Sequence, residues 1–542
     1  MKKTIALLLA AVMLLGLVAC GGTGSTAAET TAAAAETTAG SASAEATTAA
    51  GGASTANVQD TLTIGTAQDI NDLDPSDQND QINNNCICLS HQTLSYLTND
   101  AAETGITYGP MLAKEWEWED DNTLVFHLNE GITFSDGSPL TADDCVFTFE
   151  RAMAPTSKIS GTLSLITSVE ARDDLTFVVH TSSYSNEILS NISSIPMSIL
   201  SRKAFDSGMD KPYLIGSGQY VFEDWVEGQY VKYKLNENYW GDDPGVAKEI
   251  VFKPILEAAS RVIALQNGEI DVCIDPPVSE LSFLQSDKNI TVYEQDGTRL
   301  FYFGFNCAKA PFDNKTLRQA VSCAINKDAI VSVVLQGKGK VQNTVVNRGV
   351  WSFYDEDDLG AYTYDVDRAK ELLAQAGYKE GELTIDLYAA TDSPYKDIAP
   401  MIQSDLAAIG ITVNIVSLDQ ATLKSECSTG NQQCFLWRWN VLDRLDEVYT
   451  ELFTTDFSSN YHHFSDEYVD TMAKTILTEK DKDKRYDESV ELQKYLAEEC
   501  PQVPLYVANL VIAYRTGLTG TYLFGGGNHK WNHAYIDLSQ QS

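Results

Sequence analysis

The chain has 542 residues, with 38 basic and 76 acidic side chains, and therefore a formal net charge of −38 at pH 7. So acidic a surface repels phosphates and argues against a nucleic-acid partner. Hydrophobic residues make up 44% of the chain and aromatic residues 10%, which excludes a largely disordered protein. Because one core rarely serves more than roughly 250–300 residues, the length predicts two or three lobes.

The first twenty residues predict export. Lys2 and Lys3 precede an apolar run over residues 5–18, and the sequence Leu-Val-Ala-Cys ends at Cys20. The run would span only about 21 Å as a helix, too little to cross a bilayer, so residues 1–20 are interpreted as a secretory signal. Its end resembles a bacterial lipobox; an ordinary signal peptide with a chance cysteine is the alternative. We expect lipid attachment at Cys20 and a membrane-anchored protein that faces the extracytoplasmic side.

Residues 21–57 contain no aromatic residue, leucine, isoleucine or valine, and are mostly Ala, Thr, Gly and Ser. Such a segment has nothing with which to build a core, and the interspersed Thr and Gly weaken a helical interpretation. We interpret it as a flexible linker with a reach of roughly 30–35 Å.

The remaining chain alternates between strand and helix patterns. Strands are predicted over residues 60–67, 123–128, 175–181, 229–235, 269–272, 299–306, 383–388 and 411–416. Helices are predicted over residues 141–153 and 260–267, after Asn314, after the cap Asp365, and over 398–409. This alternation is typical of an α/β protein.

Cysteine and histidine patterns predict no metal and no cofactor. Apart from Cys20 there are nine cysteines, an odd number, and several lie in apolar runs as small buried side chains do. Cys86 and Cys88 are too close together for the usual zinc spacing, and a glycine-rich segment precedes His529 and His533.

A series of motifs resembles the family 5 extracellular solute-binding proteins, the periplasmic or lipid-anchored receptors of peptide and nickel ABC importers. They occur in order across nearly all of residues 60–510. The motifs are residues 110–116, 124–137, 139–152, 216–220, 238–241, 264–271, 304–306, 311–313, 317–320, 364–373 and 406–411.

The resemblance implies a periplasmic-binding-protein-like, two-lobed clamp with an extra inserted subdomain. Two strands would cross between the lobes, near residues 298–304 and 505–511. The expected parts are lobe I (58–96, 208–298 and 510–542), the inserted subdomain (97–207) and lobe II (299–509). Such a receptor is expected to be a monomer, to bind a small-molecule ligand between its lobes, and to present it to an ABC permease in the membrane.

The resemblance also suggests ligand-binding residues. Dipeptide-binding relatives hold the ligand carboxylate with an arginine before a Pro-Tyr pair, but here Ser393 precedes Pro394 and Tyr395. They hold the ligand ammonium with an aspartate shortly after a tryptophan. If Trp437 is that tryptophan, Asn440 replaces the aspartate; if Trp439 is, Asp443 is the candidate. A surface salt bridge of Asp443 with Arg444 or Lys424 is the alternative. These departures argue against short free dipeptides.

Further candidates lie around these positions. On a strand, Trp437 and Trp439 would share one face and Arg438 the other, so the tryptophans form either an aromatic wall or part of the core. Asp74 and Gln78 follow the first predicted strand, where the family lines its cleft; a polar turn is the alternative.

The sequence therefore predicts a peptide receptor of an importer, most suited to oligopeptides. An oligosaccharide or a nickel or other metal chelate on the same scaffold is the alternative. A cell-surface hydrolase is less consistent with the sequence, because no nucleophile–base motif is found and the acidic run 115–121 is better explained as a solvated hairpin edge.

Overall fold

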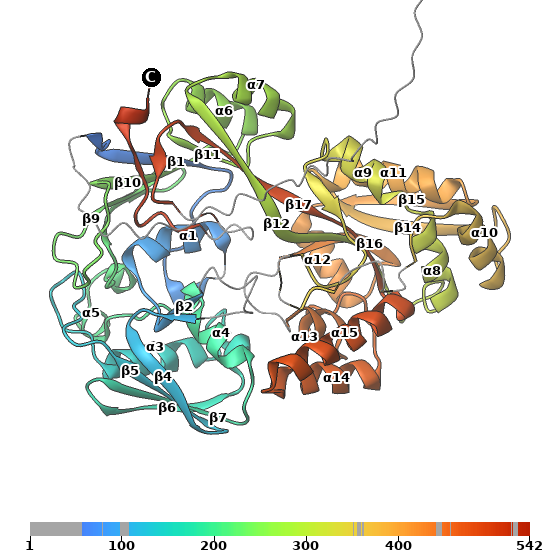
Figure 1. Cartoon of the computed structure of the whole chain (residues 1–542). Helices are drawn as coiled ribbons and strands as arrows, with labels where there is room; N and C mark the ends of the chain where they lie inside the picture. Colours follow the sequence, from blue (N-terminus) through green and yellow to red (C-terminus); the bar gives the residue numbers. More distant parts are fainter. Residues whose placement is uncertain are drawn as a thin grey trace, which may run out of the picture. The chain divides into compact units, whose positions relative to one another are not determined.

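Eleven strands of the described residues join into one mixed sheet (Figure 1). The structure is a computed structural model that describes residues 57–541 except 79, 98–107, 349, 351, 355–358, 360–361, 441–446, 456, 522 and 524–528, with only the backbone of 440 and 447. The strand order is β15-β14-β16-β12-β17-β11-β1-β10-β9-β8, and β13 pairs with β17 outside this path. Their bounds are β1 (Thr61–Thr66), β8 (Tyr220–Val226), β9 (Tyr230–Leu235), β10 (Glu249–Pro254), β11 (Val272–Ile274), β12 (Ile290–Phe305), β13 (Gly339–Val341), β14 (Leu383–Ala390), β15 (Ile411–Leu418), β16 (Cys434–Asn440) and β17 (Gln502–Arg515).

The helices lie between these strands along the chain, singly or in groups such as α13 to α15. Their bounds are α1 (Gln81–Ser90), α3 (Ala142–Met153), α4 (Glu187–Ser193), α5 (Arg202–Asp206), α6 (Ala258–Gln266), α7 (Leu281–Ser286), α8 (Lys315–Ala324), α9 (Lys327–Val334), α10 (Val366–Gln375), α11 (Tyr395–Ala407), α12 (Gln420–Thr429), α13 (Glu447–Phe453), α14 (Glu467–Thr478) and α15 (Lys482–Glu499).

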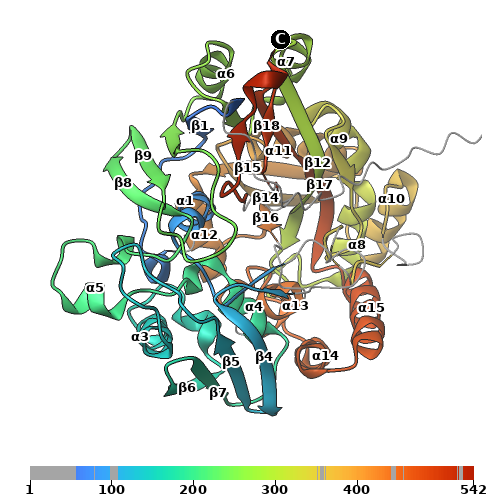
Figure 2. The same cartoon turned by 60° about the vertical axis from the view of Figure 1, so that its left-hand side comes forward.

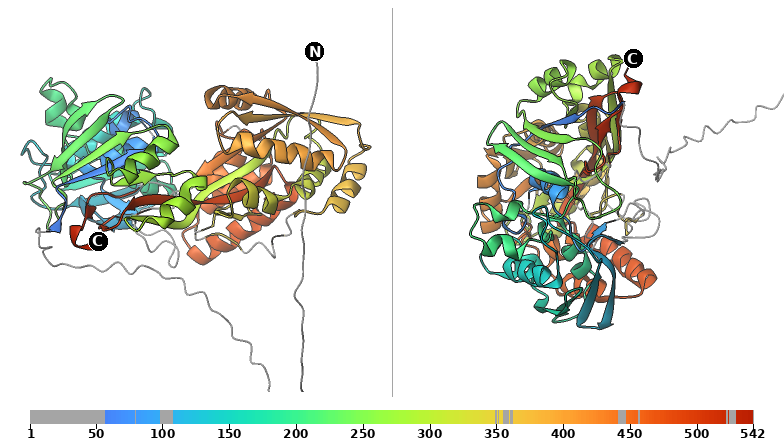
Figure 3. Two further views of the ribbon diagram at one scale, coloured as in Figure 1. Left: turned by 90° about the horizontal axis from the view of Figure 1, so that it is seen from above. Right: turned by 90° about the vertical axis from the view of Figure 1, so that its left-hand side faces the viewer.

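Two long antiparallel strands, β12 and β17, link the two halves of the sheet (Figures 1 and 3). Their pairing is regular from Ile290 to Gln295 and resumes at Arg299, so residues 296–298 form an irregularity opposite the step from Leu510 to Ala508. On one side β17 continues to β11 and β1; on the other β12 continues to β16 and β14. The two halves of the sheet therefore consist of different strands, and only β12 and β17 belong to both.

Each half of the sheet packs its own hydrophobic core. Strands β12 and β14 to β17 pack with α8 to α11 around residues such as Phe303, Leu387 and Leu406. Strands β1, β9 and β10 pack with α1 around Ile64 and Phe252.

A separate four-stranded antiparallel sheet has the order β4-β5-β7-β6. Its strands are β4 (Ala113–Asp120), β5 (Thr123–Leu128), β6 (Ile166–Asp173) and β7 (Thr176–Thr181). Helix α3 covers this sheet (Figure 2) and shares a core with it that includes Phe126, Phe149 and Phe177. Small two-stranded pairs are β2 (Ser95–Leu97) with β3 (Tyr108–Pro110), and β18 (Leu518–Thr519) with β19 (Tyr535–Ile536).

Several local predictions are confirmed by the structure. Asn314 and Asp365 are N-caps whose side chains accept from the backbone N–H groups of Leu317 and Arg368. Thr141 forms a capping box with Asp144 at the start of α3. The acidic side chains of β4 are exposed as expected.

Two strand boundaries differ from the predictions. Strand β11 begins only at Val272, because the N–H groups of Glu269 and Ile270 bond to the carbonyl of Ala264 and thereby close α6. Strand β12 begins at Ile290 rather than near Arg299, because its first half pairs with β17. The alternation of apolar and polar residues within one segment does not reveal a partner strand that lies about two hundred residues further along the chain.

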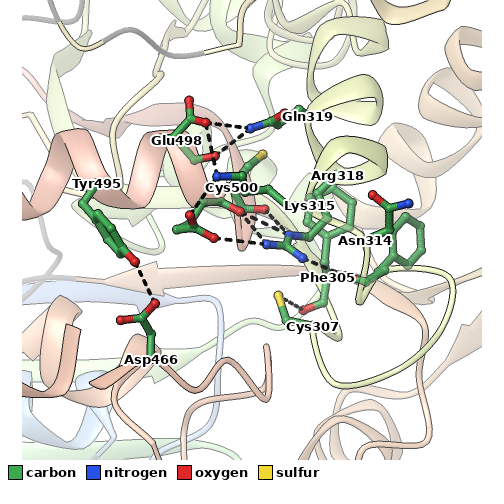
Figure 4. Close-up of polar contacts among 12 residues, drawn as sticks. Phe305, Cys307, Asn314, Lys315, Arg318, Gln319, Asp466, Tyr495, Glu498 and Cys500 are labelled. Carbon is green, nitrogen blue, oxygen red and sulfur yellow. Dashed lines mark hydrogen bonds and ion pairs between the residues drawn. The ribbon is translucent and has the colours of Figure 1, made fainter. Parts of the chain in front are cut away.

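A network of polar contacts fastens α8 to the end of α15 (Figure 4). The Arg318 side chain is 4% exposed and donates to the carbonyl oxygens of Glu499, Cys500 and Phe312 at distances between 2.6 and 3.2 Å. Lys315 Nζ lies 2.9 Å from Glu499 Oε1. These contacts fix the last turn of α15 just before β17 begins.

Candidate ligand-binding site

The pairing of β12 with β16 brings the predicted Trp-Arg-Trp segment beside the crossing strands. Arg438 lies opposite Phe301, and Asn440 lies opposite Arg299. Residues opposite one another or two positions apart share a face of an antiparallel sheet, so Arg299, Phe301 and Arg438 lie on one face.

The two tryptophans lie on the other face, as their alternation predicted. Trp437 pairs with Tyr302, and its ring meets Tyr461 edge-on at 5.8 Å. Both tryptophans are half-buried against the core, and the buried indole Nε1 of Trp439 has no hydrogen-bond partner in the described part of the chain. The structure thus gives both tryptophans a packing role, and Trp439 an unused donor.

Tyr395 lies at the arginine face, at the start of α11. Its side chain is buried, and its ring centre lies 5.8 Å from that of Phe301. Burial raises the pKa of Tyr395 to about 12, although the positive charge of Arg438 acts in the opposite direction. The phenol therefore stays protonated and can donate a hydrogen bond.

Arg299 and Arg438 are close enough to affect each other electrostatically. Burial lowers the pKa of Arg299, the charge of Arg438 lowers it further, and Asp275 acts against both. The Arg299 guanidinium donates to Gln81 Oε1 at 3.4 Å. Within the described part of the chain, neither arginine has an ion pair with a carboxylate within 4.0 Å.

Asp74 and Gln78 are already engaged by other protein groups. Both carboxylate oxygens of Asp74 accept from Arg151. Gln78 donates to Asn84 and accepts from the N–H of Asp80. That these two residues contact a ligand stays a prediction.

The remaining predicted residues can be placed only in part. The backbone of Asn440 ends β16, while Asp443 and the proposed lipid site Cys20 lie outside the described residues.

Metal-binding groups do not cluster in the described part of the chain, where no set of three His, Cys, Asp or Glu residues could hold an ion. His529 is buried, and burial lowers its pKa to about 3. All nine described cysteines are unpaired, and most are buried, including Cys273 and Cys323.

Arg299 and Gln81 were not identified from the sequence as site residues. Arg299 was interpreted as the start of a buried strand, and its proximity to Arg438 depends on a strand register that the sequence does not display.

The fold described above is that of an extracytoplasmic solute receptor: a mixed sheet whose two halves share two long crossing strands, with a separate sheet beside it. The chain belongs to the bacterial extracellular solute-binding proteins, family 5 (middle region), which match residues 107–485. The chain is thus the substrate-binding protein of an ABC transporter and not an enzyme.

Known relatives show which ligands occur in this family. The chain is 28% identical to the dipeptide-binding protein of Escherichia coli over 464 residues, 79% of this chain and 86% of that protein. It is 32% identical to heme-binding protein A of Haemophilus influenzae over 363 residues, 61% of this chain and 66% of that protein. A Helicobacter pylori periplasmic binding protein, solved in complex with the peptide STSA, superposes with a TM-score of 0.76 at 23% identity over 89% of this chain and 99% of that one. The last of these likenesses supports the fold alone.

In the part of the chain that the structure describes, we find no helix long and apolar enough to cross a membrane.

Proposed function

We propose that this protein captures oligopeptides on the extracytoplasmic side and delivers them to the permease of its transporter. The observation that carries the proposal is the convergence of two segments expected to bind ligand. Tyr395 packs against Phe301 on β12, and Arg438 on β16 pairs with that same residue. The result is a group of aromatic surfaces and hydrogen-bond donors, which suits the carbonyls, side chains and charged ends of a peptide.

The proposed capture works by closure of a clamp. Lobe I (58–96, 208–298 and 510–542) and lobe II (299–509) would rotate about the crossing strands, with 97–207 as an inserted subdomain. The interruption of β12–β17 pairing between Gln295 and Arg299 supports a hinge at this point, because it leaves local backbone without regular ladder bonds. We propose that the protein acts as a monomer anchored through a lipid on Cys20.

Other predicted residues take part in the same proposal. Asp443, or Asn440 in the alternative register, would receive the ligand's amino end. Trp437 and Trp439 lie on the opposite face of β16 from Arg438, and their contact with a ligand stays a prediction. Asp74 and Gln78 would bind a ligand group only in addition to the hydrogen bonds that they already form within the protein.

A thermal-unfolding panel tests the proposal with the mature chain. The panel contains peptides of two to nine residues, oligosaccharides, the nickel–histidine complex and heme. A peptide at about one hundred times its dissociation constant adds roughly 2.7 kcal/mol to the free energy of unfolding, so binding gives a clear rise in Tm. A rise with peptides only is expected. A rise with none of the peptides, or only with another class, contradicts the proposal.

A further inference from the structure

The positive charges of Arg299 and Arg438 lie on one sheet face, and among the described residues neither has a carboxylate within 4.0 Å. Because Arg299 pairs with Asn440 and Arg438 with Phe301, the two arginines are diagonal neighbours, for which Cα atoms lie roughly 7–8 Å apart. This juxtaposition occurs in a chain with twice as many acidic as basic residues.

The surrounding groups do not neutralise the pair. The contact of Arg299 within hydrogen-bond range is to Gln81 Oε1, a neutral acceptor. Asp275 influences Arg299 from a distance, but it is exposed and forms no ion pair with it within 4.0 Å among the described residues. Two half-buried guanidinium groups that have no described carboxylate beside them can still form favourable ion pairs with a bound anion.

Neutral donors lie beside the two arginines. Tyr395 borders Phe301, and Tyr506 stacks on Phe301 from the other neighbouring strand, with ring centres 4.9 Å apart. The hydroxyl of Tyr506 is buried and has no hydrogen-bond partner among the described residues. Tyr395 is also the first residue of the thirteen-residue helix α11, whose positive dipole end favours a negative charge.

We infer that Arg299 and Arg438, with the hydroxyl of Tyr395, form a binding site for a carboxylate of the ligand. A guanidinium matches a carboxylate with two parallel hydrogen bonds, and two of them can surround it while the phenol donates a further bond. In a peptide ligand the carboxylate would be the C-terminal one, and to this extent the inference rests on the proposed function. The charged site would also accept a free dicarboxylate or a phosphate.

Ser393 does not compete for this role. Its hydroxyl donates to Asp397 at 2.7 Å, and it carries no charge. The positive charge of the site therefore comes from the two arginines on the sheet, and not from the residue that precedes Pro394.

Calorimetric titration of the mature chain with matched ligands tests the inference. The probes are tetra-alanine and tetra-leucine, each as free acid and as C-terminal amide, together with citrate and inorganic phosphate. Since the amide loses the charge-assisted hydrogen bonds of the carboxylate, the acid should bind at least about tenfold more tightly than the amide. Arg438→Gln or Arg299→Gln should reduce this preference to about twofold, and Arg438→Lys should retain part of it.

Arg368→Gln is the matched control, because Arg368 is exposed on α10 and pairs with Glu371 at 3.1 Å. It should leave the preference unchanged. The circular dichroism spectrum and Tm of each variant show whether it is folded. If Arg438→Gln does not fold, Arg438→Lys replaces it in the test, because lysine keeps the positive charge and the aliphatic part of the side chain.

The possible results separate this inference from the proposed function. Equal affinity for acid and amide in the unaltered chain overturns the inference and leaves peptide capture standing, as does a preference that persists in both glutamine variants. Binding of citrate or phosphate that is lost in those variants, without binding of any peptide, supports the site and contradicts peptide capture. Binding of no probe contradicts both.

Discussion

The guanidinium of Arg151 on α3 binds both carboxylate oxygens of Asp74, with Nη1 2.7 Å from Oδ1 and Nη2 2.5 Å from Oδ2. Asp74 also caps the short turn Pro75–Asp77 by accepting from the N–H of Ser76. Its side chain is 10% exposed and that of Arg151 is 28% exposed. The pair therefore ties the loop after β1 to the helix that covers the four-stranded sheet.

Replacing Asp74 by Asn should lower the free energy of unfolding by about 1–3 kcal/mol, because the bidentate charged contact is lost while Arg151 stays partly buried. Urea denaturation measures the change. Asp77→Asn is the control, since Asp77 is half-exposed and its nearest cation, Lys158, lies 3.9 Å away. A loss for Asp74→Asn no larger than that of the control would show that the pair contributes little.

Replacing Arg318 by Met should lower the free energy of unfolding by about 3–5 kcal/mol, because three buried carbonyl groups lose their donor while the volume is kept. Thermal and urea unfolding measure the loss. Lys315→Met is the control, because Lys315 is 40% exposed at the same helix end, and its ion pairs should contribute less than about 1 kcal/mol. Similar losses for the two variants would contradict a special role for Arg318.

Local signals in the sequence were sufficient for much of the fold. Thr141, Asn314 and Asp365 were recognisable as helix starts, because a cap depends on a side chain and backbone N–H groups two or three residues away. Helix α15 was not predicted, because its polar sequence obscures the apolar stripe, which consists of little more than Leu492 and Leu496. Helix α14 was not predicted either, although its buried residues Val469, Ala473 and Ile476 recur at helical spacing.

In the candidate site, too, relations within one strand could be predicted from the sequence, whereas contacts between distant segments could not. The opposite faces of Trp437 and Arg438 follow from alternation within one strand. The approach of Arg438 to Arg299 follows from the register between β16 and β12, and the engagement of Asp74 follows from the packing of α3. Neither relation is encoded by neighbouring residues, so neither could be read from the sequence.

Replacing Cys20 by Ser should move the protein from the membrane fraction to the medium or periplasm, because the proposed acyl chains are its means of attachment. Fractionation and incorporation of labelled fatty acid measure the effect. Cys88→Ser keeps the proposed anchor and serves as the control. Membrane retention of Cys20→Ser with no loss of label would contradict lipid attachment at this residue.

His91, the residue that ends α1, should make stability depend on pH. Its ring is buried, with Nδ1 2.9 Å from Ser90 Oγ, and burial lowers its pKa to about 4. In the unfolded chain histidine titrates near 6.5, so the unfolded state binds more protons between these two values. The resulting stabilisation is complete above pH 6.5 and is lost progressively as the pH falls toward 4. Buried His462 and His529, whose pKa values are lowered to about 3, act in the same direction.

Urea unfolding at pH 7.5, 6 and 5 measures this dependence above the range in which most carboxylates titrate. His91 alone should account for about 2 kcal/mol of the stability lost between pH 7.5 and 5. The variant His91→Gln keeps a polar side chain of similar size but cannot titrate, so its stability should fall by about 2 kcal/mol less over the same interval. His180→Gln is the control, because it makes the same substitution at a side chain that is 34% exposed. An identical pH dependence for His91→Gln and the unaltered chain would show that His91 does not become protonated on unfolding in this interval.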